Sequence, residues 1–124
     1  MSERARRKQA EAARERIRAY NAVRKDGGMP DLVDVRAMVE SEDPDIASRA
    51  AALLLMTVAG RGPEAFEAET PRLIRVARSG NLPRRADIYL LGSLAWTRCV
   101  YILQAVVRTR CEPDPGLRTL PPGP

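Results

Sequence analysis

Basic side chains crowd the N-terminal part of this 124-residue chain, where seven cations lie between residues 4 and 18. The candidate anion-binding residues among them are Arg4, Arg6, Arg7, Lys8, Arg14 and Arg18. On a helix, Arg7, Arg14 and Arg18 share one side, since they are seven and four residues apart. Such a stripe can follow the phosphates of a nucleic acid or meet the carboxylates of an acidic partner. Glutamates at helical spacing interrupt the stripe, which is typical of an ordinary solvated helix.

Arg98 is the second candidate, because it lies almost at the centre of an apolar run that spans residues 88–107. A guanidinium in such a run must reach water, pair with a carboxylate or face a binding groove. We expect an acidic residue of segment 29–60 to pair with Arg98. The alternative is a partner groove, formed by Arg98, Trp96 and Tyr101, that binds an anion or an acidic peptide.

The same apolar run has twenty residues, which is the length of a membrane span. Arg98 would cost about 2.5–3.5 kcal/mol at the centre of a bilayer. The uncharged stretches on either side of Arg98 are ten and nine residues long, which is the length of a core helix. We therefore expect this helix to lie at the centre of the fold, wrapped by the others, and we do not expect a membrane partner.

Catalysis has little support in the sequence. The chain has no histidine, the commonest general base and metal ligand. Its two cysteines, Cys99 and Cys111, are twelve residues apart on one predicted helix, or about 18 Å, which is too far for a disulfide. The sequence thus predicts a protein that is not an enzyme and needs no cofactor or metal. Free thiols, and a charged N-terminus without an apolar signal segment, suit a cytoplasmic location.

The net charge of +5 is unevenly distributed along the chain. Segment 1–28 carries +5, segment 29–60 carries −4 and segment 81–111 carries +4. The basic N-terminal arm either reaches outward to an acidic partner or lies against the carboxylates of its own chain. Those carboxylates belong to Asp31, Asp34, Glu40, Glu42, Asp43 and Asp45.

The local patterns all predict helices, and no segment alternates like a strand. Good helix formers without Gly or Pro fill residues 2–25, and Asp26-Gly27-Gly28 ends that helix. Its apolar seam is thin, so we expect the first dozen residues to fray or to project into solvent. A second helix begins near its N-cap, Asp31, and a third spans Pro44 to Ala59 after the N-cap Asp43.

The second half of the chain is also helical in pattern. The unbroken apolar run at residues 50–56 predicts that the third helix is nearly surrounded by protein. We expect a short helix at residues 63–69, and the pair Thr70-Pro71 predicts a break or sharp kink before the next helical piece. The last helix is expected from Leu82-Pro83 to about Arg110, and five prolines make residues 112–124 a flexible tail.

Two segments resemble each other at a shift of 36 residues. Residues 46–55 and 82–91 place an arginine, an alanine and two leucines at the same positions, with a proline near each start. Paired helices with a period in the high thirties make residues 30–107 resemble HEAT or armadillo repeats. This resemblance implies a stack of two helical hairpins that serves as a binding scaffold, without a catalytic function.

The sequence therefore predicts an all-α protein, either a small helical bundle or a two-unit, HEAT-like stack of helical hairpins. Its parts are a projecting basic helical arm (1–28), a helical core (29–111) and a disordered, Pro-rich tail (112–124). We expect a small interaction protein, an adaptor or assembly subunit, that binds another protein or itself. The alternative is an accessory or regulatory protein that binds nucleic acid through its arginine-rich N-terminal helix.

Overall fold

The structure is a computed structural model that describes residues 2–111. This part of the chain contains five α-helices. They are α1 (Glu3–Lys25), α2 (Leu32–Val39), α3 (Pro44–Ala59), α4 (Pro63–Ala77) and α5 (Ala86–Cys111). No strand occurs between residues 2 and 111, and the all-α fold class is confirmed. The predicted tail at 112–124 lies outside the described residues.

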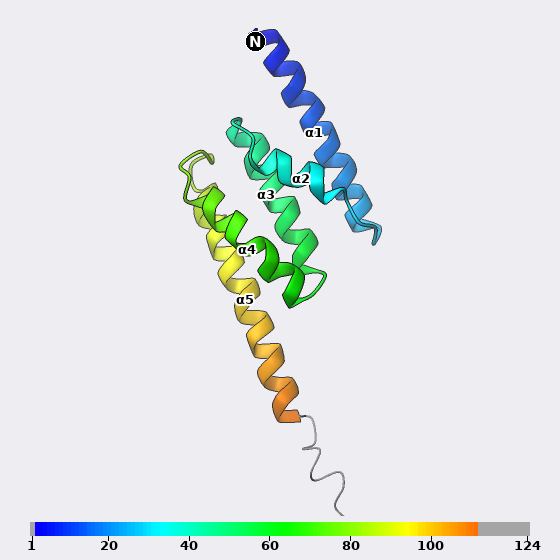
Figure 1. Ribbon diagram of the computed structural model, residues 1–124, viewed down its shortest axis with the longest axis vertical. Helices are drawn as coiled ribbons and strands as arrows, with labels where there is room; N and C mark the ends of the chain where they lie inside the picture. The colour runs from blue at the N-terminus through cyan, green and yellow to red at the C-terminus, as the bar shows by residue number, and fades with distance from the viewer. Residues whose placement is uncertain (1, 112–124) are drawn as a thin grey trace, which may run out of the picture.

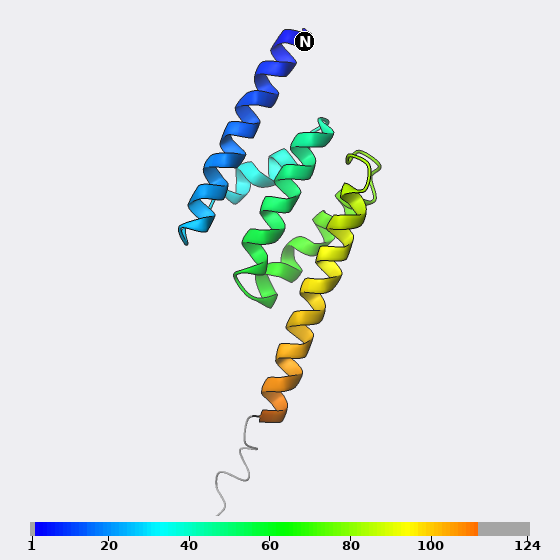
Figure 2. The same cartoon turned by 180° about the vertical axis from the view of Figure 1, so that it is seen from behind.

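The helices form two layers, as Figure 1 shows. The helices α1, α3 and α5 lie side by side in one layer, and the shorter α2 and α4 cross them in the other; Figure 2 shows the same order from behind. The middle helix is α3, because it contacts each of the other four. The first half of α1 extends past the body at one end, and the second half of α5 extends past it at the other. The molecule is therefore elongated.

The core is built on α3, as its unbroken apolar run predicts. Nine of its sixteen residues are buried. Leu53 and Leu54 are fully enclosed, in one apolar cluster with Val35 of α2 and with Phe66 and Leu73 of α4. This burial of α3 on several sides is what joins the two layers.

The helix α1 joins the same core through a thin seam near its C-terminal end. Ala13 and Ile17 are buried, and Tyr20 packs partly buried against them. The first ten residues of α1 bury no side chain fully, yet they are helical and project from the body. The arm is therefore anchored by its second half alone.

The predicted N-caps of α2 and α3 are confirmed. Oδ1 of Asp31 accepts hydrogen bonds from two backbone N–H groups of the first turn of α2, at 3.1 and 3.3 Å. Oδ1 of Asp43 does the same for α3, at 2.9 and 3.4 Å. Pro44 occupies the first helical position, where an N–H would have no partner within the helix. These caps fix where α2 and α3 begin, and so they position the acidic residues that face α1.

The predicted break at Thr70-Pro71 is wrong, because α4 runs without interruption from Pro63 to Ala77. Pro71 lies on the exposed side of this helix. Phe66 and Leu73, on either side of the proline, are both fully buried in the core, so packing holds the two halves together despite the missing N–H. The hydroxyl of Thr70 also donates a hydrogen bond to the carbonyl oxygen of Phe66 at 2.8 Å.

The predicted central position of the last helix is also wrong. Only Leu90 and Leu94 are buried in α5, which lies at the edge of its layer. The reason is length: α5 has 26 residues, whereas α3 and α4 have 16 and 15, so neither can cover its second half. The helix begins at Ala86, later than expected, because Arg85 has a φ of 72°, in the left-handed region that an α-helix excludes.

Candidate functional site

The exposed side of α5 carries a large set of uncovered apolar side chains. Eight large apolar residues on it each expose between 38% and 74% of their surface. We call these residues the α5 outer face: Ile88, Tyr89, Leu91, Trp96, Ile102, Leu103, Val106 and Val107. Exposed large apolar side chains elsewhere between residues 2 and 111 are scattered over α1, α2, α3 and one loop. A contiguous patch of this kind is typical of an interaction site.

The opposite side of α5 fixes the helix to the body. Leu90 and Leu94 are buried, and the ring of Tyr101 lies 5.7 Å from that of Phe66, centroid to centroid. The hydroxyl of Tyr101 donates a hydrogen bond to the carbonyl oxygen of Ala59, at the end of α3. At 3.6 residues per turn, the three α5 side chains point within about 40° of one another, on the side away from the outer face. Another molecule can therefore reach the outer face without displacing α3 or α4.

An ion pair between Arg98 and Glu67 joins α5 to α4. Nε of Arg98 lies 3.1 Å from Oε1 of Glu67, and both side chains are about half exposed. The expectation that Arg98 pairs with an acidic residue of segment 29–60 is therefore wrong. The reason is that α4, which packs along α5, supplies a carboxylate of its own.

Arg98, Trp96 and Tyr101 do not form one groove. Tyr101 packs on Phe66, and Arg98 faces Glu67. Trp96 is 72% exposed on the outer face, and residues two apart on a helix point about 160° away from each other. Of the three predicted groove residues, only Trp96 belongs to the surface that an apolar partner can reach.

Comparisons of the chain with protein-family models, with curated proteins and with solved structures found no match. The role of the α5 outer face is therefore inferred from the residues of this chain alone.

Sequence reasoning placed the outer-face residues in a core, because an apolar run of that length is typical of a buried helix. Helix length is the signal that could have located those in the second half of α5. An apolar helix of 26 residues cannot be covered along its whole length by neighbours of 16 and 15 residues.

The second half of the basic arm lies against the acidic segment of its own chain. Nε of Arg14 donates a hydrogen bond to Oδ2 of Asp45 at 2.9 Å, and Nε of Arg16 donates one to Oδ2 of Asp34 at 3.0 Å. The hydroxyl of Tyr20 donates to the same oxygen of Asp34 at 2.6 Å. Three side chains of α1 are thus paired with carboxylates of α2 and α3.

These contacts shift the pKa values of the groups that make them. The hydrogen bond from Arg14 is the main cause that lowers the pKa of Asp45. The hydrogen bond to Asp34, followed by burial, raises the pKa of Tyr20 to about 12, because a neutral phenol can donate to a carboxylate whereas a phenolate cannot. Protonation of Asp45 or ionisation of Tyr20 therefore weakens the attachment of α1.

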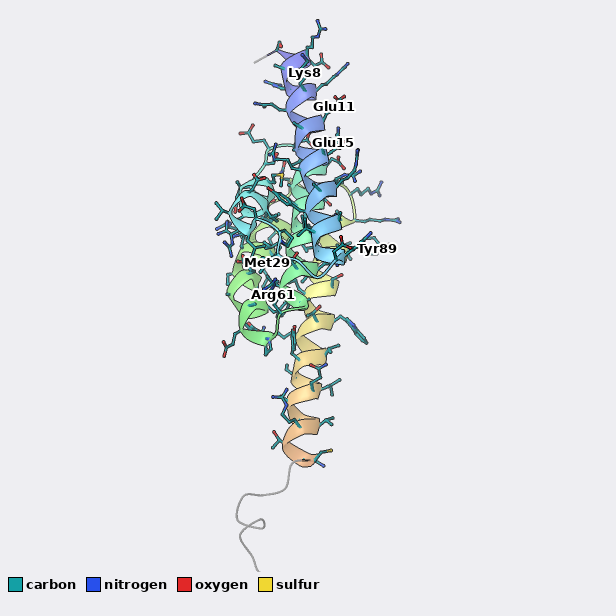
Figure 3. All side chains as sticks on the ribbon, turned by 90° about the vertical axis from the view of Figure 1, so that its right-hand side faces the viewer. Lys8, Glu11, Glu15, Met29, Arg61 and Tyr89 are labelled. Atoms are coloured by element: carbon teal, nitrogen blue, oxygen red, sulfur yellow. The ribbon has the colours of Figure 1, made fainter. Side chains whose placement is uncertain are left out.

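The six predicted anion-binding residues fall into three groups. Arg4, Arg6 and Lys8 are exposed on the projecting end and form no ion pair within residues 2–111; Lys8 is labelled there in Figure 3. Arg7 and Arg18 pair with glutamates of α1 itself, Arg7 at 3.1 Å. Arg14 pairs with Asp45 at 2.9 Å. The structure therefore leaves three of the six cations without an ionic partner in the described chain.

An open groove of about 990 Å³ separates the projecting half of α1 from α2 and the start of α3. Its walls mix small or apolar side chains, such as Ala13 and Met38, with charges of both signs, such as Arg6 and Glu42. Between residues 2 and 111, no three His, Cys, Asp or Glu residues are grouped so that they could hold a metal ion.

By length and composition, α5 could cross a membrane, with a mean hydropathy of 1.5 over its most apolar stretch. Only 11% of that stretch is buried, unlike the enclosed core helix of a soluble protein. The outer face must therefore be assigned either to a protein surface or to lipid.

Proposed function

We propose that this chain is a small, non-enzymatic interaction protein, an adaptor or assembly subunit, whose α5 outer face binds a protein surface. The observation that carries this proposal is the row of eight large apolar side chains exposed on one helix. Covering apolar surface stabilises a complex by about 25 cal/mol per Å², so water is a poor environment for this face.

A protein surface fits the outer face better than a bilayer. The inner side of α5 is held by α3 and α4, and α4 exposes the charged residues Glu64, Glu67 and Arg75. A bilayer around α5 would either enclose these charges or strip α5 from the body, and both are costly. A protein partner requires neither, because it needs to reach only the outer face.

The layered arrangement supports a role as a scaffold. The helices α1, α3 and α5 form one row and α2 and α4 the other, an order that suits stacked helical hairpins of the HEAT type. In such a stack each helix is covered by the next one in its row. The last helix of this row is α5, so its outer face is the position where a further helical layer would pack.

The two cysteines support a reducing compartment, and we place the protein in the cytoplasm. Cys99 and Cys111 are both free and exposed. Exposed thiols persist where glutathione and thioredoxin keep them reduced.

One substitution pair tests this proposal in a membrane-free extract of cells that make the protein. Leu103→Asp puts a charge on the outer face, whereas Gln104→Asp puts the same charge on the next residue, about 100° around the helix. We expect the tagged wild-type chain and Gln104→Asp to elute in size-exclusion chromatography as a complex, and Leu103→Asp to elute as a monomer. Equal elution of wild type and Leu103→Asp would contradict the proposal.

One observation favours a second function, binding to nucleic acid through the arm. Arg4, Arg6 and Lys8 project from the body without an ionic partner in the described chain. Cations on a projecting helix can neutralise phosphates without disturbing the core.

A further inference from the structure

The central residues of the outer side of α5 follow the spacing of a helix–helix seam. Six residues, separated by four, three, four, three and four positions, form what we call the α5 seam: Ile88, Gly92, Ala95, Cys99, Ile102 and Val106. This alternation of four and three keeps one stripe facing a second helix, as in coiled coils. All six residues are exposed, so the whole seam is open to a partner.

The seam is complementary to itself in an antiparallel pair. If two copies of α5 cross at Thr97, Ile88 faces Val106 of the second copy, Gly92 faces Ile102, and Ala95 faces Cys99. The large side chain of Ile102 thus meets Gly92, the smallest residue of the seam, and the two small residues Ala95 and Cys99 meet each other. In a parallel pair Gly92 would face Gly92 and Ala95 would face Ala95, which leaves the middle of the seam unfilled.

The residues that flank the seam also match. A two-fold axis through Thr97 brings each flank of α5 against the same flank of the second copy. On one flank Trp96 approaches Trp96 of the second copy, and Tyr89 lies beside Leu103. On the other flank Leu91 lies beside Ile102, and Arg98 approaches Arg98 of the second copy, each arginine being paired with Glu67 of its own chain. The antiparallel pair therefore covers seven of the eight outer-face residues, all but Val107.

The pair also covers the part of α5 that the body leaves bare. The last part of α5, orange in Figure 3, projects past the body, and residues 102–111 are all exposed. In this pair they lie along the supported first half of the other α5. Tyr89 and Trp96 are 74% and 72% exposed, and large aromatic side chains present about 150–250 Å² each; with the six aliphatic residues, the outer face exposes on the order of 1,000 Å² per chain. Two copies together then reach the roughly 1,200–2,000 Å² that a stable interface buries.

The charges near the seam make the proposed self-association depend on salt. Arg98, the charge nearest to the crossing point, is already paired with Glu67. Arg84, Arg85 and Arg110 lie at the two ends, where arginines of the two copies approach one another. Salt screens this repulsion and leaves apolar burial intact, so self-association should strengthen as salt rises from about 0.05 to 0.5 M.

We propose that the occupant of the α5 outer face is a second copy of this chain, bound through an antiparallel α5–α5 pair with a two-fold axis near Thr97. This inference rests on the proposed function, because it names the partner of the same surface.

Cysteine cross-linking tests the register of the pair. In a Cys111→Ser background, Ala95→Cys adds a thiol that faces Cys99 of the second copy, and the matched control Ser93→Cys adds one about 140° away from the seam. With an added oxidant that accepts the two electrons and two protons of each thiol pair, we expect covalent dimers from Ala95→Cys only. Dimers from Cys111→Ser alone would show a parallel pair joined through Cys99, and monomers from every variant would also overturn the inference.

Gly92→Leu distinguishes a helix from lipid as the occupant. A Cβ at residue 92 meets nothing within 4 Å in the single chain, so the substitution leaves the fold intact and removes a helix-weakening glycine. We expect self-association of the purified chain, measured by sedimentation equilibrium, to weaken at least about tenfold. Stronger binding of Gly92→Leu to vesicles of phosphatidylcholine and phosphatidylglycerol, with no change in self-association, would overturn the inference in favour of lipid.

The single tryptophan, Trp96, gives an independent readout. Its emission should shift to the blue as wild-type concentration rises from about 1 to 100 μM, because dimerisation removes it from water. A flat emission maximum and a monomer mass over this range would overturn the inference. If the purified chain is monomeric while the complex in extract is still lost in Leu103→Asp, the proposed function stands and only the second copy is wrong.

Discussion

Arg98 of α5 and Glu67 of α4 form an ion pair at 3.1 Å beside the α5 outer face. Arg98 is the only charged residue between positions 88 and 107. Because Glu67 neutralises it from the body side, the middle of the outer face carries no net charge. The pair thus leaves the α5 outer face suitable for packing against another helix.

Glu67→Gln should separate the stability of the chain from its association. The ion pair is half exposed, so its loss should reduce the free energy of unfolding by less than about 1 kcal/mol in urea titrations. Association through the outer face should weaken more clearly, and most at low salt, because Arg98 is left unpaired. The control Glu64→Gln changes an exposed residue of α4 that forms no ion pair within residues 2–111. Equal effects of the two variants on association would contradict this role of Glu67.

Tyr101→Phe should loosen α5 from α3. The substitution removes the hydrogen bond from the Tyr101 hydroxyl to the carbonyl oxygen of Ala59, at a cost of about 1 kcal/mol in the free energy of unfolding. Tyr89→Phe is the matched control, because Tyr89 is 74% exposed. This substitution should leave the free energy of unfolding within about 0.5 kcal/mol of wild type. If the urea unfolding curves of the two variants coincide, the Tyr101 contact does not stabilise the chain.

Local patterns in the sequence were sufficient for much of the fold. The caps at Asp31 and Asp43 and the burial of α3 follow from residue type and spacing. The break predicted at Pro71 was wrong, because a proline predicts a break from local chemistry alone. In the fold, Phe66 and Leu73 hold α4 together through tertiary packing. Local propensity contains no information about such packing.

Alkaline pH should destabilise the contact between α1 and α2. The hydrogen bond to Asp34 raises the pKa of Tyr20 to about 12 in the folded chain, against about 10 when unfolded. Stability from this contact is therefore fully present below about pH 10 and is lost as pH rises towards 12. Urea titrations should show that Tyr20→Phe costs about 1.5 kcal/mol at pH 8 and progressively less above pH 10.

An Asp34→Asn background provides the control for this pH dependence. Without the carboxylate, the difference in free energy of unfolding between the chain with Tyr20 and the Tyr20→Phe variant should no longer vary with pH. If the free-energy cost of Tyr20→Phe stays constant between pH 8 and about pH 11.5 in the wild-type background, the proposed contact between Tyr20 and Asp34 is wrong.

The arm offers a test of the second proposed function. If Arg4, Arg6 and Lys8 bind phosphates, changing all three to Gln should reduce the slope of log affinity against log salt by about 2–3 for duplex DNA or RNA. Arg14→Gln should change this slope less, because its guanidinium is paired with Asp45. A wild-type chain that shows no retention on nucleic acid at low salt excludes this function.

The candidate site was harder to predict than the fold. The sequence predicted a groove formed by Trp96, Arg98 and Tyr101, because these residues are close in sequence. On the α-helix, however, their side chains point in different directions. Only Trp96 lies on the outer face. Whether an apolar side chain is buried depends on which neighbour reaches it, and α3 and α4 are too short to reach the second half of α5.

The most direct test of whether a protein covers the outer face is an alkylation experiment in a membrane-free extract. It compares the alkylation rate of Cys99 with that of Cys111. Both thiols are free and exposed in the single chain, and Cys99 lies in the middle of the seam. We predict that Cys99 reacts at least about tenfold more slowly than Cys111 in the wild-type chain, and that Leu103→Asp abolishes this difference. Equal rates for the two thiols in the wild-type chain would contradict the assignment of the α5 outer face as an interaction surface.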